Sequence, residues 1–303
     1  MKKILVTGTG GRVGAQVARE LLENGFEVRA LDVSPLRSYL RDHAQRAHLE
    51  TVYADVTDRL AVLKAAEGCE GIAHLAAIPH PMQDGSKVLS SNVVGTSNIL
   101  EAAEAAGIKR VVLASSCCAF GIFFASHDIR PQYFPVDESH VCINEDVYGL
   151  SKRMNEMTAE AFSRRAGITT VSLRLTTVLN LEGHEHLHWR KRQLARAGSW
   201  LAKDFWSYVD ERDAARAFRL SLTAELEGHH VLIIAARDSF ALHDIRELAR
   251  HHYPEVPLEE SRVAADGCLF SSELAEKTIA WVAQHSWREN EELRQVQPEP
   301  LEK

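Results

Sequence analysis

The sequence predicts an α/β fold, a doubly wound parallel sheet with a small C-terminal substrate-binding lobe. Three observations lead to this prediction. Short apolar runs alternate with segments whose apolar residues recur at helical spacing. A glycine-rich turn directly follows the first apolar run. Several later runs end in small or polar residues, at the edge where a parallel sheet carries its ligand site.

Composition excludes several classes of protein. With 303 residues, the chain can bury a large core in one or two domains. A formal net charge of -7 gives no basic surface for a nucleic acid. We expect no membrane partner, because no apolar run is long enough to span a bilayer. Five cysteines without metal-ligand spacing, and a start unlike a secretory signal, favour a cytoplasmic location.

The first unit is predicted as strand, turn and helix. A buried-type strand over residues 4–7 is followed by Gly8-Thr9-Gly10-Gly11-Arg12-Val13-Gly14 and then by apolar residues at helical spacing. Gly8 allows a tight turn, Gly11 removes a side chain where a pyrophosphate approaches, and Gly14 lets helix and strand pack closely. The helix N-terminus offers free N–H groups to a phosphate. The alternative is a glycine turn without a ligand.

The second predicted strand, over residues 28–31, ends at Asp32. A carboxylate at this position can accept hydrogen bonds from both hydroxyls of an adenosine ribose, and it would repel a 2′-phosphate. Asp32 therefore favours NAD over NADP. Arg12 and Arg37 lie close enough in the sequence to pair with a phosphate, which leaves NADP as the alternative.

The alternation of strands and helices continues to residue 251. Further strands are predicted over residues 49–53, 71–75, 110–114, 169–175 and 230–234, and further helices over about residues 60–66, 92–100, 147–165, 209–222 and 243–251. Asp55-Val56 is placed to touch an adenine ring, and Ala76-Ala77 permits close approach of a cofactor. Ser115-Ser116 ends its strand. Residues 117–146 are predicted as an irregular loop over the site.

Tyr148 and Lys152 fall one turn apart on the same face of the predicted helix. An ammonium group close to a phenol favours the phenolate and lowers the pKa of the tyrosine. Such a phenol can exchange a proton with a substrate alcohol or carbonyl near neutral pH. Because Tyr-x-x-x-Lys is common on exposed helices, the pair alone is weak evidence for a catalytic role. Its interpretation depends on the other motifs.

Together these motifs resemble the extended short-chain dehydrogenase/reductases, in the NAD-dependent epimerase/dehydratase family. The matching segments are Thr7-Gly8-x-Gly10-Gly11-x-x-Gly14, Asp32, Asp55-Val56, His74-Leu75-Ala76-Ala77, Asn92-Val93-x-Gly95-Thr96, Ser115-Ser116, Tyr148-x-x-x-Lys152 and Trp206-Ser207-Tyr208-Val209-Asp210. A further similarity, to the closing helix of the family, covers residues 274–281.

The resemblance implies roles for individual residues. Tyr148 is the general acid/base, Lys152 lowers its pKa and holds the nicotinamide ribose, and Ser116 hydrogen-bonds the reacting oxygen. Ser115 is the alternative to Ser116. The positions implied for cofactor binding are Gly8, Gly10, Gly11, Arg12, Val13, Gly14, Asp32, Asp55, Val56, Leu75, Ala76, Ala77, Asn92, Ser115, Tyr148, Lys152 and Thr177. Phe120 replaces a tyrosine that is frequent in the family.

The domain organisation follows from the same resemblance. Residues 1–178 form the dinucleotide-binding domain, which residues 206–236 complete. Residues 179–205 and 237–290 form the substrate-binding lobe. Residues 291–303 are charged and contain proline, which predicts a mobile tail.

The substrate-side sequence departs from the family pattern. Asn180-Leu181-Glu182 stands where sugar-nucleotide epimerases commonly have Asn-Val-Tyr-Gly-Pro. His184, His186 and His188 alternate, but without a supporting carboxylate or cysteine constellation we expect no metal. The basic residues from Arg190 to Arg196 either meet a substrate carboxylate or phosphate or form a solvated face. Cys117-Cys118 is interpreted as packing residues, since no activating histidine is evident.

We therefore expect an NAD-dependent oxidoreductase that transfers hydride between nicotinamide and a secondary alcohol or ketone of a sugar-like or related small substrate. The first alternative is a sugar-nucleotide epimerase or dehydratase with the same triad and retained NAD. The second is an NAD-sensing protein without turnover. The resemblance also implies a homodimer, formed through the helices that carry Asn92 and Tyr148.

Overall fold

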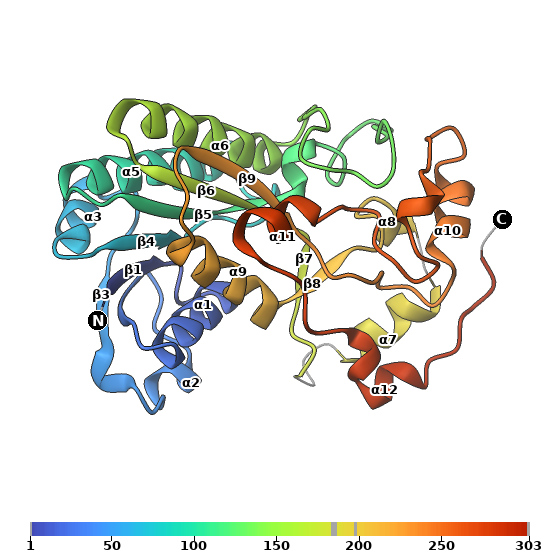
Figure 1. Ribbon diagram of the computed structural model, residues 1–303, viewed down its shortest axis with the longest axis horizontal. Helices are drawn as coiled ribbons and strands as arrows, with labels where there is room; N and C mark the ends of the chain where they lie inside the picture. Colours follow the sequence, from blue (N-terminus) through green and yellow to red (C-terminus); the bar gives the residue numbers. More distant parts are fainter. Residues whose placement is uncertain (1, 183–186, 197–198, 302–303) are drawn as a thin grey trace.

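A seven-stranded sheet with helices on both faces forms the body of the protein (Figure 1). A computed structural model describes residues 2–182, 187–196 and 199–301. The strand order is β3-β2-β1-β4-β5-β6-β9, and every neighbouring pair is parallel. The strands are β1 (Lys3–Thr7), β2 (Glu27–Asp32), β3 (Leu49–Tyr53), β4 (Gly71–His74), β5 (Arg110–Ser116), β6 (Thr169–Leu175) and β9 (His229–Ile234). The predicted doubly wound fold is confirmed.

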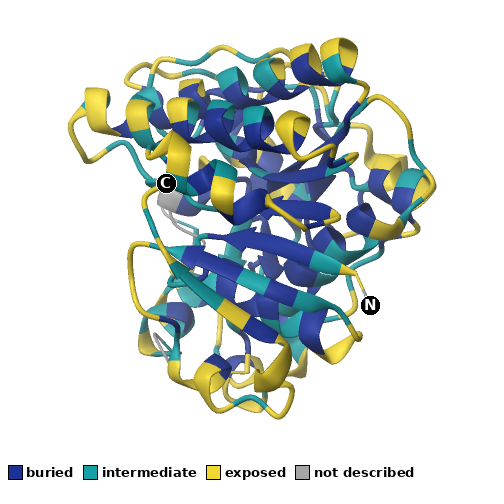
Figure 2. Ribbon diagram, turned by 90° about the vertical axis from the view of Figure 1, so that its left-hand side faces the viewer, coloured by how far each residue is buried: buried dark blue, intermediate teal, exposed yellow. Residues whose placement is uncertain are grey.

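The helices cover the sheet on both faces, which explains the apolar strands. One face carries α1 (Arg12–Glu23), α9 (Glu211–Thr223) and α11 (Glu273–Ile279), and the other carries α3 (Arg59–Ala66), α5 (Gly95–Ala105) and α6 (Val147–Ala166). Figure 2 shows the central strands buried between these two layers. Every residue of β4 and β6 is buried. Strands buried on both faces are expected to read as continuous apolar runs.

Two segments differ from the predicted elements. The helix expected from residue 209 begins at Glu211, because Tyr208–Asp210 forms the strand β8, which pairs in parallel with β7 (Thr177–Leu179). Asp210 ends β8 and caps α9 by accepting a hydrogen bond from the Arg212 N–H at 2.9 Å. The helix that carries Asn92 is interrupted, since α4 (Gly85–Leu89) passes through a π-helical segment, Ser90–Val94, before α5. The hydrophobic periodicity of the sequence reveals neither the short strand β8 nor the π-helical segment.

The C-terminal lobe has a hydrophobic core of its own. Its helices are α7 (Leu187–Arg196), α8 (Ser199–Ala202), α10 (Ile245–His252) and α12 (Glu291–Arg294), while the short α2 (Ser38–Arg41) lies in the first domain. The core includes the buried side chains of Phe134, Phe205, Trp206 and Trp287. Phe134 belongs to the loop over residues 117–146, so this loop packs against the same core.

The C-terminal segment packs on the lobe. Leu293 is fully buried, and the Glu299 N–H donates to the Ala195 carbonyl at 2.7 Å. Two ion pairs join this segment to α7, Lys191 with Glu292 at 2.7 Å and Arg196 with Glu299 at 3.5 Å. This packing of residues 291–301 differs from the mobile tail expected for residues 291–303, because α7 supplies partners that the local composition does not reveal. Within the described ranges, no helix is long and apolar enough to span a bilayer.

Candidate active site

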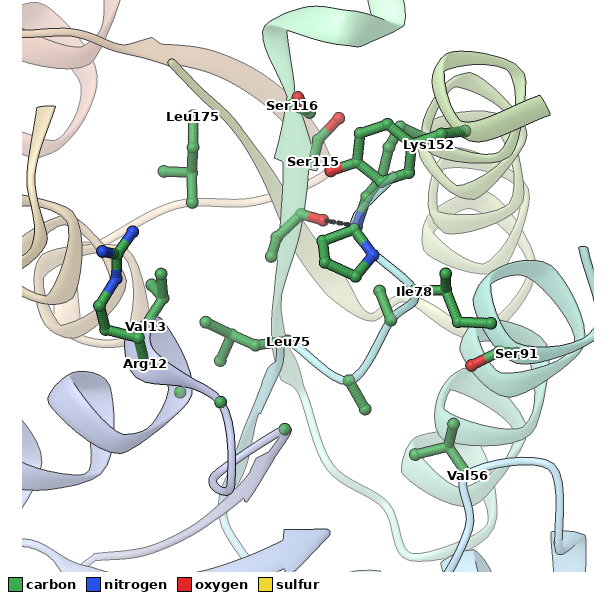
Figure 3. Close-up of a pocket in the computed structure, with 18 of the residues that line it drawn as sticks. Arg12, Val13, Val56, Leu75, Ile78, Ser91, Ser115, Ser116, Lys152 and Leu175 are labelled. Carbon is green, nitrogen blue, oxygen red and sulfur yellow. Dashed lines mark hydrogen bonds between the residues drawn. The ribbon is translucent and has the colours of Figure 1, made fainter. Parts of the chain in front are cut away.

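A cavity of about 1090 Å³ lies along the C-terminal edge of the sheet. Its lining comes from the segments that follow β1, β2, β4 and β5, from the start of α6 and from the segment after β6. Figure 3 shows Lys152 reaching from α6 toward Ser115 and Ser116, with Arg12 and Val13 on the opposite side. Every predicted cofactor-binding and catalytic residue except Asn92 lines this one cavity. A parallel sheet is expected to bind its ligand at this edge.

The glycine turn after β1 has the geometry of a phosphate-binding turn. Gly8 has a φ of +78°, and a Cβ at this position would lie 2.7 Å from the Ala76 nitrogen. A Cβ at Gly14 would lie 2.1 Å from the Gly8 carbonyl oxygen, so only glycine allows α1 to approach β1 this closely. Gly11 is the N-cap of α1 and provides no side-chain cap. The first N–H groups of α1 are therefore left to a ligand.

Asp32 presents its carboxylate to the cavity from the end of β2. Its Oδ2 accepts the Gly10 N–H at 2.9 Å, and its Oδ1 accepts the Ser34 N–H at 2.7 Å. Each oxygen retains a second lone pair that can accept a ribose hydroxyl. Arg12 donates to the Val178 carbonyl at 2.5 Å and pairs with Glu211 at 3.5 Å. Arg37 does not line the cavity, and this arrangement suits an unphosphorylated ribose.

A buried histidine fixes the segment after β4. Thr7 Oγ1 lies 2.7 Å from His74 Nδ1, and His74 Nε2 lies 3.1 Å from Thr96 Oγ1. The Thr7 hydroxyl also accepts the N–H groups of Leu75 and Ala76, each at 3.1 Å. Burial lowers the pKa of His74 to about 3, so that the ring is neutral. His74 thus has a structural role, which is to hold the small residues that border the cavity.

Asn92 differs from the prediction that it binds the cofactor. Its Oδ1 accepts the Ile78 N–H at 2.8 Å, and its Nδ2 donates to the Ile78 carbonyl at 3.1 Å and to Ser151 Oγ at 2.9 Å. Ser151 Oγ donates in turn to the Tyr148 carbonyl at 2.7 Å. Asn92 is fully buried and does not line the cavity. It joins the loop after β4 to the first turn of α6, which positions Tyr148.

The two serines at the end of β5 have different surroundings. Ser115 Oγ donates to Glu156 Oε1 at 2.7 Å, so its hydroxyl is bound to α6. Ser116 Oγ accepts the Cys118 N–H at 3.1 Å, and its hydroxyl lies near enough to Tyr148 to lower the pKa of the tyrosine. Of the two alternatives left by the sequence, this geometry favours Ser116 as the serine beside the tyrosine hydroxyl.

Tyr148 and Lys152 are both buried in the cavity wall, with 8% and 4% of their surfaces exposed. Lys152 Nζ donates to the Ala114 carbonyl at 2.7 Å and lies 5.6 Å from the centre of the Tyr148 ring (Figure 3). Burial raises the pKa of Tyr148 well above its ordinary value, and the nearby Ser116 hydroxyl offsets this only in part. Burial also lowers the pKa of Lys152 to about 8. The expected lowering of the Tyr148 pKa is therefore wrong for this structure, because desolvation disfavours both charged forms.

The remaining cavity wall includes residues that the sequence did not identify. They lie in loops, at element ends or in the helical segment from α4 to residue 94: Ser34, Thr57, Ile78, Pro79, Lys87, Ser90, Ser91, Phe123, Phe124, Thr176 and Asp204. Asp204 is 6% exposed, and its carboxylate accepts a hydrogen bond from the Thr177 hydroxyl. Asp204 stands two residues before the family segment that starts at Trp206, and this position could have identified it as a candidate site residue.

The cysteines have the properties of packing residues. All five are free thiols. Burial raises the pKa of Cys118 to about 12 and that of Cys117 well above its ordinary value. A thiol with such a pKa is not an activated nucleophile at neutral pH.

The basic run of α7 does not reach the cavity. Arg190 is buried and donates to the Asn180 carbonyl at 2.6 Å, while Lys191 and Arg196 pair with carboxylates of the C-terminal segment. None of the three lines the cavity. His184 and His186 lie outside the described residues. The described part of the chain contains no group of three potential metal ligands.

Comparison with known proteins agrees with this geometry. The model of the NAD dependent epimerase/dehydratase family matches residues 4–234. An L-arabinose 1-dehydrogenase (NAD(P)(+)) of Haloferax volcanii is 32% identical over 187 residues, which are 60% of this chain and 69% of that protein. A UDP-glucose 4-epimerase of Corynebacterium glutamicum is 26% identical over 94% of this chain and 92% of its own. A solved structure of a mutated uronate dehydrogenase has a TM-score of 0.68 at 24% identity and covers 99% of this chain and 88% of its own, which shows the same fold.

Proposed function

The chain belongs to the NAD-dependent epimerase/dehydratase family, and we propose that it is an NAD-dependent oxidoreductase acting on a secondary alcohol or ketone of a sugar-like substrate. The observation that supports this proposal most directly is the convergence of Ser116, Tyr148 and Lys152 on the cavity that also contains the glycine turn and Asp32. An NAD-sensing protein would need only the turn and the carboxylate.

The residues present fit NAD. The turn from Gly8 to Gly14 and the free N–H groups of α1 would hold the pyrophosphate, and Asp32 would hold the adenosine ribose. Lys152, on the opposite side of the cavity, would contact the nicotinamide ribose. When bound, the nicotinamide of NAD accepts or returns a hydride.

Hydride transfer is accompanied by transfer of a proton to or from the substrate oxygen. This proton transfer would depend on Ser116, Tyr148 and Lys152. Ser116 Oγ would hold the substrate oxygen beside the Tyr148 hydroxyl. The raised pKa of Tyr148 keeps this hydroxyl protonated at neutral pH, which is the form that donates a proton to a carbonyl oxygen. Oxidation of an alcohol requires the phenolate, and Lys152, one turn along α6, would provide the positive charge that stabilises it.

The proposal is tested by mixing purified protein with NAD and a panel of sugars, uronates and sugar nucleotides. Net absorbance of NADH with one class of substrate is the expected result. The second candidate is an epimerase, favoured by the relative that matches 94% of the chain. Product without net NADH would support that candidate, and NAD binding without any product would support a sensor. Either result would overturn the dehydrogenase proposal.

Asp32→Ala is expected to shift cofactor preference toward NADP. Loss of the ribose contact should weaken NAD binding by roughly 10- to 100-fold, because a hydrogen bond to a charged group contributes about 1.5–3 kcal/mol. Removal of the negative charge should strengthen NADP binding. Dissociation constants for both cofactors, measured by calorimetry, check this result. Asp42→Ala, which alters an exposed carboxylate after α2, is the control. An unchanged ratio of the two constants would contradict the assigned role of Asp32.

We further propose a homodimer formed through α6 and the segment before α5. Large apolar side chains are exposed there, with Val94 at 49%, Leu150 at 41% and Met157 at 55%. Exposed apolar residues on neighbouring helices are typical of an interface. We expect light scattering to give twice the chain mass of 33.8 kDa, and the double variant Leu150→Glu, Met157→Glu to give the mass of one chain. Leu60→Glu, which alters an exposed leucine of α3, should leave the dimer intact. A monomeric wild type would refute this assembly.

We also propose a cytoplasmic location. The supporting observation is that all five cysteines are free thiols, as is usual where thiols are kept reduced.

A further inference from the structure

Asp204 is a buried carboxylate in the wall of the catalytic cavity. It lines this cavity together with Ser116, Tyr148 and Cys118, and 6% of its surface is exposed. The hydroxyl and the backbone N–H of Thr177, another lining residue, hydrogen-bond to the carboxylate. Asp204 is thus held in the wall of the cavity that also contains Tyr148, and the proton transfer described above does not use it.

The backbone after Asp204 is held in an unusual conformation. Phe205 and Trp206 have positive φ values of 53° and 50°. Such residues cost on the order of 1–3 kcal/mol each and persist where the surrounding structure fixes them. Here the Trp206 N–H donates to the Leu201 carbonyl at 2.9 Å, and the Ser207 N–H donates to the Asp204 carbonyl at 2.9 Å. Phe205 and Trp206 are 1% and 0% exposed. The fold therefore determines where Asp204 points.

The chemistry of Asp204 suits a hydroxyl group. As a carboxylate, it accepts a hydrogen bond from a substrate hydroxyl, and as an acid it donates one to a substrate oxygen. Burial raises the pKa of Asp204 to about 7, so both forms are accessible near neutral pH. Neither form is a good partner for an anion, since the carboxylate repels it and the acid leaves its charge uncompensated.

Two of the three described cationic side chains that line the cavity are already bound to other groups of the protein. Among the described lining residues, the positively charged side chains are Arg12, Lys87 and Lys152. Arg12 is bound to Val178 and Glu211, and Lys152 is bound to Ala114. The third cation, Lys87, belongs to α4. Lys191 and Arg196 of the basic run of α7, which could have met a substrate anion, pair instead with the C-terminal segment.

We propose that Asp204 binds a hydroxyl of the substrate and makes the site selective for a neutral polyhydroxy compound, of the aldose class, over the corresponding uronate or sugar phosphate. This inference rests on the proposed oxidoreductase function and specifies the substrate class of the same site.

The test compares wild type with Asp204→Asn, whose amide oxygen can still accept the hydrogen bond from Thr177. Each protein is assayed with NAD and three substrates that share one ring: an aldose, its uronate and its 6-phosphate. In wild type, we expect kcat/KM for the aldose to exceed both others at least roughly tenfold. Asp204→Asn should lower kcat/KM for the aldose by on the order of 10- to 100-fold, mainly by raising KM. The ratio of kcat/KM for the aldose to kcat/KM for the uronate or the phosphate should therefore decrease. Asp128→Asn, at a side chain that is 74% exposed, is the matched control.

A wild type that prefers the uronate or the phosphate, or an Asp204→Asn variant with an unchanged ratio, would overturn the proposal. Absence of NADH with all three substrates would count against the oxidoreductase function instead. Calorimetric binding of the same compounds to NADH-loaded protein then tests Asp204 without turnover. Aldose binding that Asp204→Asn weakens would support the proposal, and equal binding of all three compounds would overturn it. If Asp204→Asn does not fold, Thr177→Val, which removes the hydroxyl that orients the carboxylate, should raise KM for the aldose, and an unchanged KM would overturn the proposal.

Discussion

Tyr148→Phe is expected to lower kcat by roughly 10²- to 10⁴-fold, the range that a positioned general acid/base contributes. The substitution removes one oxygen and keeps the ring, whose edge-on contact with Phe124 at 6.2 Å does not involve the hydroxyl. The backbone carbonyl of Tyr148 still accepts the Ser151 hydroxyl. We therefore expect the fold and NAD affinity to change little while the chemical step slows.

Single-turnover kinetics, together with the dissociation constant for NAD, check this expectation. Tyr53→Phe, at a tyrosine that is 67% exposed and does not itself line the cavity, is the matched control. Full turnover by Tyr148→Phe would exclude Tyr148 as the group that exchanges the proton. A parallel loss of NAD binding would instead assign the tyrosine a role in holding the cofactor.

The fold could be predicted because its determinants are local and repeated. Apolar strands such as residues 4–7 and 111–114 lie between helical segments, and residues buried on both faces of a sheet have few alternatives. The three-residue strands β7 and β8 could not be predicted, since they are too short for any periodicity and exist only because they pair with each other. The packing of Leu293 could not be predicted either, because its partners lie far away in the sequence.

The candidate site was predictable where a residue type is required by backbone geometry. Gly8 and Gly14 are examples, because a side chain at either position would collide with the backbone. Asn92 shows the limit: its place in the motif suggested a cofactor contact, and in the structure its amide joins the loop after β4 to the start of α6. The pKa of Tyr148 was also beyond the sequence, since the spacing to Lys152 is visible but the burial of both groups is not.

A buried ion pair behind the site leads to the second large prediction. Arg174 Nε and Nη2 donate to the two carboxylate oxygens of Glu156, each at 2.9 Å, and Glu156 also accepts Ser115 Oγ and Arg153. The side chains of Glu156 and Arg174 are 1% and 3% exposed. The guanidinium of Arg174 lies 4.5 Å from the centre of the Phe120 ring. This network joins β5, α6 and β6, and its member Ser115 immediately precedes Ser116.

Glu156→Ala is expected to lower the free energy of unfolding by about 3–5 kcal/mol at pH 7, because it leaves the buried charge of Arg174 without its partner. Urea denaturation followed by circular dichroism measures this change. Glu160→Ala, one turn along the same helix, removes a surface carboxylate that is 52% exposed and paired with Arg164. That control should change stability by less than about 1 kcal/mol. The double variant Glu156→Leu, Arg174→Met should recover much of the loss, since it removes both charges.

The effect of Glu156→Ala should also depend on pH. Burial alone would raise the pKa of Glu156, but the hydrogen bond and charge of Arg174 lower it overall, below the ordinary value of 4.5. A carboxyl with a lowered pKa in the folded state contributes stability above its unfolded pKa and loses it as the pH falls through its folded pKa. The stability difference between wild type and Glu156→Ala should therefore be complete at pH 7 and narrow on acidification below 4.5. A difference that stayed constant over this range, or one below about 1 kcal/mol at pH 7, would show that the pair does not hold the site together.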